Sequence, residues 1–177
     1  AESAAYHCHR FNLQFKGPVD DTSAGYETYI KIIGEWAYVF LFISSKNLVL
    51  SAYHLAHSRE TLPAVITMTE AIRTAEPQQK ISLITDGNPS YPAGIHFMNE
   101  KRPQELPRIE HHAVIGLQNL DQESETYRSF KQLIERLNRT FKFHVRPASG
   151  FKSDNGALSL VVLFATHYNF LRPHISL

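Results

Sequence analysis

The chain has 177 residues, of which 43% are hydrophobic and 20% charged, a composition typical of one folded domain rather than of a disordered or fibrous protein. Its single cysteine excludes an internal disulfide and a four-thiolate zinc site, and the longest apolar run, residues 37–43, is far shorter than the roughly 20 residues of a membrane-spanning helix. The net charge is only +1, so a nucleic-acid partner must be indicated by local clusters of basic residues. Without a signal sequence, we expect a soluble, cytoplasmic protein.

The first 18 residues show no regular spacing of apolar side chains, and we expect an amino-terminal linker at 1–18 before a single domain at 19–177. Because the chain starts with Ala1 rather than Met, it is expected to be part of a longer protein. His7, Cys8 and His9 are metal-ligand types, but no further ligand lies nearby in the sequence. We therefore predict a loop there rather than a metal site.

From residue 27 the pattern is that of an α/β domain. Three segments rich in aromatic and β-branched residues, separated by short polar turns, predict an antiparallel meander. They are residues 27–33, 36–44 and 48–55. Apolar residues at helical spacing then predict a helix over 62–72 that crosses the sheet.

The second half of the domain is predicted to add two strands and three helices. A short buried strand at 80–85 precedes a Gly-Asn-Pro-Ser turn, a short helix at 91–98 and a fifth strand at 111–117. Two apolar stripes predict closing helices over 130–141 and 157–171, the second capped by Asp154 or Asn155. These elements predict an α/β fold with a mixed sheet.

Asp86 stands directly after the strand at 80–85, where a carboxylate points into the crevice in which open α/β sheets bind ligands. Asp is equally common at the start of turns that contain Gly and Pro, because its side chain hydrogen-bonds the turn backbone. The position alone leaves Asp86 between a catalytic and a structural role.

Glu135 lies on the polar face of the first closing helix, with Asn138, Arg139 and Lys142 at i+3, i+4 and i+7. Such faces are usually solvated and held by i,i+4 pairs, here Glu135 with Arg139. Basic residues are concentrated around this helix, which suits contacts along a phosphate backbone as well as a face that serves solubility. They are Lys131, Arg136, Arg139, Lys142, His144, Arg146 and Lys152.

Five segments, taken together and in this order, resemble bacterial insertion-sequence transposases of the DDE superfamily, whose catalytic core is like that of retroviral integrases. They are residues 27–32 (ETYIKI), 84–87 (ITDG), 133–142 (LIERLNRTFK), 150–153 (GFKS) and 168–174 (YNFLRPH). The resemblance covers about residues 19–177. It implies a ribonuclease-H-like mixed five-stranded sheet, three antiparallel strands followed by two parallel ones, flanked by helices.

The resemblance also implies a two-metal phosphoryl transferase, in which three carboxylates hold Mg²⁺ (or Mn²⁺) ions that activate water or a DNA 3′-hydroxyl. Asp86 would be the second carboxylate and Glu135 the third. Of the acids between residues 121 and 135, only Glu135 is followed by the Arg-Leu-Asn-Arg-Thr-Phe-Lys run typical of the family.

The partners implied are transposon-end and target DNA, with further copies of the chain in a homo-oligomer, in the cytoplasm of a bacterium. Arg136, Arg139, Lys142 and Lys152 are the predicted DNA contacts, and two of them, Arg139 and Lys142, match family positions that contact phosphates. The family usually carries a helix-turn-helix before the core, so the DNA-end sequence is expected to be recognised by an upstream region.

The chain departs from the family at the first carboxylate. Members usually have Asp-Glu-Thr where this chain has Tyr-Glu-Thr, so Tyr26 occupies the position of the first catalytic Asp. A phenol with a pKa of about 10 stays neutral at pH 7 and cannot supply a carboxylate's charge to a hard cation. Glu27 would point to the opposite face of the strand, unless a bulge at Gly25 shifts the phase. Asp20 or Asp21 could reach the site only if the preceding loop folded back.

Two functions follow from these observations. The first is a transposase catalytic domain that carries out metal-dependent DNA cleavage and strand transfer, impaired because Tyr26 replaces the first catalytic Asp. The alternative is a catalytically inactive DNA-binding or assembly module derived from a transposase. A ribonuclease-H-like nuclease acting on RNA would not need the Tyr-Asn…Arg-Pro-His ending, and we place it behind both.

Overall fold

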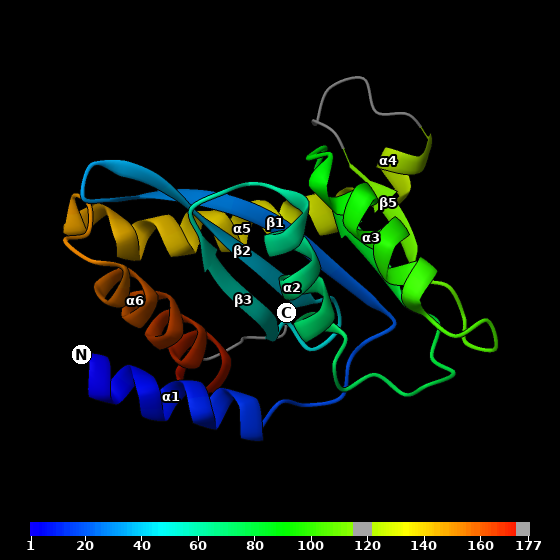
Figure 1. Ribbon diagram of the computed structural model, residues 1–177, viewed down its shortest axis with the longest axis horizontal. Coiled ribbons are helices and arrows are strands. Elements are labelled where there is room, and N and C mark those ends of the chain that lie inside the picture. The colour runs from blue at the N-terminus through cyan, green and yellow to red at the C-terminus, as the bar shows by residue number, and fades with distance from the viewer. Residues whose placement is uncertain (115–121, 173–177) are drawn as a thin grey trace.

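The computed structural model describes residues 1–114 and 122–172 (Figure 1). Five strands form one sheet in the order β3-β2-β1-β4-β5. β1 (Thr22–Ile32), β2 (Glu35–Ser44) and β3 (Leu50–Ala56) form the antiparallel meander, and β4 (Ser82–Thr85) and β5 (Glu110–Ala113) extend it in parallel with β1. The mixed five-stranded sheet is confirmed. β5 ends before residues 115–117 of the predicted strand, which lie outside the described residues.

Helices cover both faces of the sheet. α2 (Thr61–Ala71) and α3 (Ser90–Lys101) pack over one face, with Phe40 and Phe42 of β2 in the shared core. α5 (Arg128–Val145) and α6 (Asp154–Thr166) pack over the other, with Val39 and Leu41. α4 (Gln122–Thr126) precedes α5, the short turn η1 (Arg146–Ala148) follows it, and η2 (His167–Leu171) extends α6. In the described parts of the chain, no helix is long and apolar enough to cross a membrane.

The amino-terminal segment is helical, which corrects the predicted loop around His7–His9. α1 (Glu2–Gln14) lies alongside α6 (Figure 1), with Ala5 buried between them. Asn12 donates a hydrogen bond to Thr166 Oγ1 at 3.0 Å, and the ring of Phe11 contacts that of Phe170. These contacts stabilise a helix whose own sequence carries little helical periodicity.

The predicted cap of the second closing helix is also wrong. α6 is capped by Ser153, whose Oγ accepts a hydrogen bond from Gly156 N at 3.1 Å, instead of by Asp154 or Asn155. β1 pairs with β2 without interruption from Ser23 to Ile32, so no bulge forms at Gly25. A glycine is needed there because a Cβ would lie 2.2 Å from the Phe42 ring.

The first closing helix matches its prediction closely. Ile134, Leu137 and Phe141 of α5 are at most 4% exposed and pack against the sheet. Each such side chain contributes about 1.5–3 kcal/mol when fully buried. This stripe fixes the rotation of α5 about its axis, and with it the position of Glu135 relative to β1.

Candidate active site

Tyr26 and Glu27 lie side by side on β1 and face opposite sides of the sheet, as strand alternation predicts. Tyr26 belongs to the apolar core under α5 and α6, together with Ile134 and Leu137. Glu27 faces the α2 and α3 side, where it meets Arg59 and Asn88. The two residues at the family's first-acid motif are therefore in different environments.

Tyr26 is buried as a neutral phenol. Its side chain is 2% exposed, and its hydroxyl has no hydrogen-bond partner among the described residues. Burial, with a smaller effect of Tyr168, raises the pKa of Tyr26 well above its ordinary value. The residue predicted at the first-acid position thus carries no charge at neutral pH.

Glu27 is a buried carboxylate that is paired with the guanidinium group of Arg59. Its side chain is 6% exposed, forms an ion pair with Arg59, and accepts a hydrogen bond from Asn88 Nδ2 at 2.7 Å. Burial raises the pKa of Glu27 and the charge of Asp86 acts in the same direction, while Arg59 and Asn88 partly offset them. Glu27 is therefore the acid that interacts electrostatically with Asp86.

Asp86 follows β4, and its side chain takes part in the turn that the sequence predicted. Asp86 Oδ1 accepts a hydrogen bond from Asn88 N at 3.2 Å, and Thr85 Oγ1 donates to the Asp86 carbonyl at 3.0 Å. Asn88 links this turn to Glu27 and, through its Oδ1, to Ser90 N at the start of α3. Asp86 thus has the structural role in the turn, through Oδ1, and its other carboxylate oxygen remains for other contacts.

Glu135 is half-buried on α5, beside the buried Ile134. It forms no ion pair with Arg139, so the i,i+4 pair considered from the sequence is not made between these two described residues. Asn138, one turn further on, has a buried Oδ1 without a partner in the described chain. The charge of Glu135 is therefore not neutralised by Arg139.

The acids of the preceding loop are engaged elsewhere. Asp20 accepts hydrogen bonds from Ser44 Oγ and, at 2.8 Å, from Lys46 N in the β2–β3 turn. Asp21 accepts one from Gln79 Nε2 at 2.8 Å. Neither contact brings a carboxylate to the position of Tyr26.

The residues present do not fit a pair of divalent cations. Of the three residues that the resemblance predicts at the catalytic positions, Asp86 and Glu135 are carboxylates and Tyr26 is a buried neutral phenol, whereas hard cations require charged oxygen ligands. Across residues 1–114 and 122–172, no group of three or more His, Cys, Asp and Glu side chains is gathered so as to hold a metal ion. We therefore derive no metal-dependent step for the chain as it stands.

Sequence reasoning did not find Arg59 and Asn88. Arg59 lies between β3 and α2 in a segment without a motif, so nothing in the sequence indicated its partner. The sequence places Asn88 only in a turn, although the side chains of such turn residues commonly hydrogen-bond to nearby groups. Arg59 lies just before α2 and Asn88 just before α3, and both are brought to Glu27 as these helices pack over this face of the sheet.

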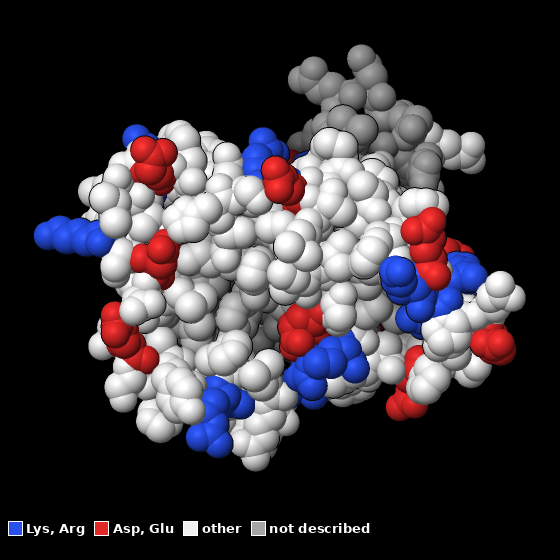
Figure 2. Space-filling view, in the orientation of Figure 1, with Lys and Arg blue, Asp and Glu red and all other residues white. Residues whose placement is uncertain are grey.

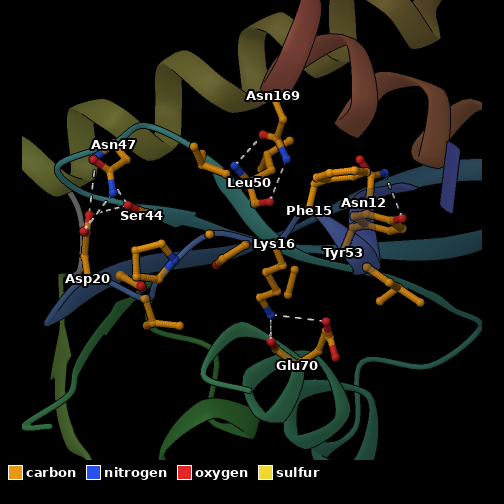
Figure 3. A pocket seen from close by; sticks show the side chains of 18 of the residues that line it. Asn12, Phe15, Lys16, Asp20, Ser44, Asn47, Leu50, Tyr53, Glu70 and Asn169 are labelled. Carbon is orange, nitrogen blue, oxygen red and sulfur yellow. Dashed lines mark hydrogen bonds and ion pairs between the residues drawn. The ribbon is translucent and has the colours of Figure 1, made fainter. Parts of the chain in front are cut away.

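A cavity of about 200 Å³ lies apart from these residues, between α1, β3 and η2 (Figure 3). Lys16 points into it and is held by the carbonyl and the carboxylate of Glu70, and Asn169 pairs with the backbone of Leu50. Tyr26, Asp86 and Glu135 do not line it. The cavity is a consequence of how α1 docks and is separate from the candidate active site.

Three of the four predicted DNA contacts, Arg136, Arg139 and Lys152, have exposed side chains. Lys142 differs, because its Nζ donates to the Tyr29 carbonyl and lies 3.9 Å from the centre of the Tyr29 ring. Burial and the nearby Arg146 lower the pKa of Lys142. On the face seen in Figure 2, basic and acidic side chains alternate without a broad region of one sign.

A family model described as a DDE domain of IS240-type transposases matches residues 24–170. The chain belongs to this DDE transposase family. The match includes Tyr26, Asp86 and Glu135, so all three positions lie within the DDE domain. A comparison with curated proteins gives no significant match.

Solved structures share the fold of this DDE domain at low identity. The HTLV-2 integrase catalytic core domain in complex with magnesium is 12% identical, with a TM-score of 0.54 over 82% of this chain and 84% of that one. The simian T-cell lymphotropic virus intasome in complex with the PP2A regulatory subunit B56 gamma is 13% identical, with a TM-score of 0.51 over 92% and 60%. The Mos1 strand transfer complex is 10% identical, with a TM-score of 0.51 over 97% and 54%. The DDE domain therefore has the retroviral-integrase-like core fold.

Proposed function

We propose that this DDE domain is a transposase catalytic core whose metal-dependent cleavage and joining of DNA is impaired by Tyr26. The observation that carries the proposal is the burial of Tyr26 as a neutral side chain among Ile134 and Leu137, at the position of the first acid. Two similar structures, by their names, are an integrase core in complex with magnesium and a strand transfer complex.

The remaining parts of the site are assigned by the same reasoning. Asp86 is the second acid, at the end of β4, and Glu135 is the third, on α5. Arg136, Arg139 and Lys152 contact phosphates of transposon-end and target DNA, since their cations are exposed around α5. Lys142 contributes more weakly, because its ammonium group is already held at Tyr29. The chain acts as a homo-oligomer on paired DNA ends.

The test is metal-dependent nicking and joining of transposon-end DNA by the chain and by Tyr26→Asp, with Mg²⁺ or Mn²⁺ binding followed by calorimetry. We expect Tyr26→Asp to bind metal and to raise turnover strongly, because it completes the set of three carboxylates. Tyr26→Asn is the matched control, because Asn has the shape of Asp without its charge. It is expected neither to bind metal nor to raise turnover. Adding Asp86→Asn or Glu135→Gln to the Asp variant is expected to abolish the gain.

The outcomes separate the two candidate functions. Equal turnover in the chain and in Tyr26→Asp would show that another acid completes the site and that there is no impairment. DNA binding without turnover in either protein would favour the alternative, an inactive DNA-binding or assembly module, which the uncharged Tyr26 also supports.

A further inference from the structure

The β1–β2 hairpin carries an uncovered aromatic surface. Its tip projects away from α2 and α3 (Figure 1). Tyr29 is paired with Tyr38 and Lys31 with Trp36, so the four side chains share one face of the sheet, here called the aromatic face. Tyr29 is 55% exposed and Trp36 50% exposed, and their rings meet edge to face with centroids 5.0 Å apart.

Three rings of the aromatic face each have a cation beside them. Lys31 lies 4.8 Å from the centre of the Trp36 ring, and Arg59 lies 5.5 Å from that of Tyr38. Lys142 reaches Tyr29 from α5. On the same face Glu27 is already paired with Arg59, and Glu35 lies opposite Ile32 on the other side of the strand pair. The aromatic face therefore combines exposed rings with an excess of positive charge.

We propose that the aromatic face binds unpaired bases of single-stranded DNA, an inference that rests on DNA being the substrate of the proposed function. Exposed rings flanked by cations suit this partner, because bases stack on the rings while the phosphates meet the cations. A duplex keeps its bases stacked inside and cannot use the rings in this way. The face runs from the hairpin tip to Arg59, whose partner Glu27 is linked through Asn88 to Asp86, so a bound strand leads toward Asp86, one of the two proposed catalytic acids.

The experiment uses Trp36 as its own reporter, because it is the only tryptophan of the chain. The full chain is titrated, in buffer with a metal chelator, with oligo-dT, with an abasic oligonucleotide of the same length, and with a blunt duplex. We expect saturable quenching of tryptophan fluorescence by oligo-dT and none by the abasic strand. The duplex is expected to bind, by anisotropy of a label on the DNA, without quenching.

Variants locate the binding. Trp36→Ala and Tyr29→Ala, measured by anisotropy of labelled oligo-dT, are each expected to weaken binding by about tenfold, with duplex affinity unchanged. Phe97→Ala is the matched control, since Phe97 is 47% exposed and has Lys101 at 5.8 Å from its ring, but lies on α3. It is expected to have no effect on either DNA.

The outcomes distinguish this inference from the proposed function. Duplex binding without quenching by oligo-dT would overturn the inference and leave the proposed function intact. Quenching by oligo-dT together with an inactive Tyr26→Asp would support the aromatic face and count against the catalytic proposal. A change in tryptophan fluorescence on raising the protein concentration alone, together with a dimer that the original chain forms and Trp36→Ala does not, would make the face an interface between copies and overturn the inference.

Discussion

The neighbouring residues Tyr26 and Glu27 are buried on opposite faces of β1, one in an apolar environment and the other in a polar one. Under α5 and α6, Tyr26 is surrounded by apolar side chains and stays neutral. Under α2 and α3, Glu27 is almost as deeply buried, but it has a guanidinium group and an amide as partners. A buried carboxylate requires such partners, because transfer of an unpaired charge out of water is very costly.

This difference explains why Glu27 is not placed to act as the first acid proposed for position 26. Its carboxylate is one residue away in the sequence, yet it is on the other face from α5 and Glu135. Its charge is also already balanced by Arg59. Whether an acid on a strand can take the role of its neighbour therefore depends more on the face on which it lies than on its distance along the sequence.

The largest expected effect comes from placing a charge on the apolar face. Tyr26→Asp, without metal, should lower the free energy of unfolding by about 3–5 kcal/mol, because it removes a buried ring and leaves a buried carboxylate without a partner. Chemical denaturation measures this change, and saturating Mg²⁺ should recover part of it. A metal-free Asp variant as stable as the original chain would contradict the apolar environment assigned to Tyr26.

A smaller effect is expected from removing the cation on the other face. Arg59→Met should lower the free energy of unfolding by about 2 kcal/mol, less than for a fully buried pair because Arg59 is partly solvated. Adding Glu27→Gln should restore most of the loss. Arg73→Met is the control: its partner Glu70 has a side chain that is 32% exposed, against 6% for Glu27, and its loss should cost about 0.5 kcal/mol or less. Equal losses at Arg59 and Arg73 would contradict the special role of the Glu27 pair.

Removing only the hydroxyl of Tyr26 should have the opposite sign. Tyr26→Phe is expected to raise the free energy of unfolding by about 1 kcal/mol, since the hydroxyl is buried without a partner in the described chain. Tyr53→Phe is the contrast, because its hydroxyl interacts with His9 at 2.8 Å and Asn12 at 3.2 Å, and the variant should be less stable. Denaturation midpoints of the two variants that move in the same direction would contradict this comparison.

The smallest effect is a dependence on pH. Burial raises the folded-state pKa of Glu27, so its stabilising contribution is complete below the ordinary glutamate pKa of about 4.3 and is lost as the pH rises through the raised value. The stability of the original chain relative to Glu27→Gln should therefore fall as the pH rises. Thermal unfolding of both proteins across this range measures the difference, and a flat difference would show that Arg59 fully compensates for burial.

Asp20 should show the opposite dependence. Burial acts to raise its pKa, but the hydrogen bonds from Ser44, Lys46 and Asn47 outweigh it and lower the pKa. Its contribution is present above the ordinary aspartate pKa and is lost as the pH falls through the lowered value. The stability of the original chain relative to Asp20→Asn should thus fall with decreasing pH. A difference that grows as the pH falls would contradict the direction assigned to Asp20.

The sequence by itself determined the sheet and the family, because these depend on local patterns. Strand alternation placed Tyr26 and Glu27 on opposite faces, and the stripe of Ile134, Leu137 and Phe141 defined the closing helix. The segments around Asp86 and Glu135 carried the resemblance that the family match confirms. The catalytic roles of these two acids stay predictions.

Only the tertiary structure decided which side chains meet. α1 is a helix because Phe11 and Asn12 pack against η2 and α6, and the ammonium group of Lys142 is held at Tyr29 instead of standing free on the basic surface. Arg59 meets Glu27 because β2 and β3 fold back alongside β1, which brings the segment after β3 next to the Glu27 carboxylate. The physical reason is that periodicity reports which face of an element is buried, whereas ion pairs and ring contacts depend on elements far apart in the chain.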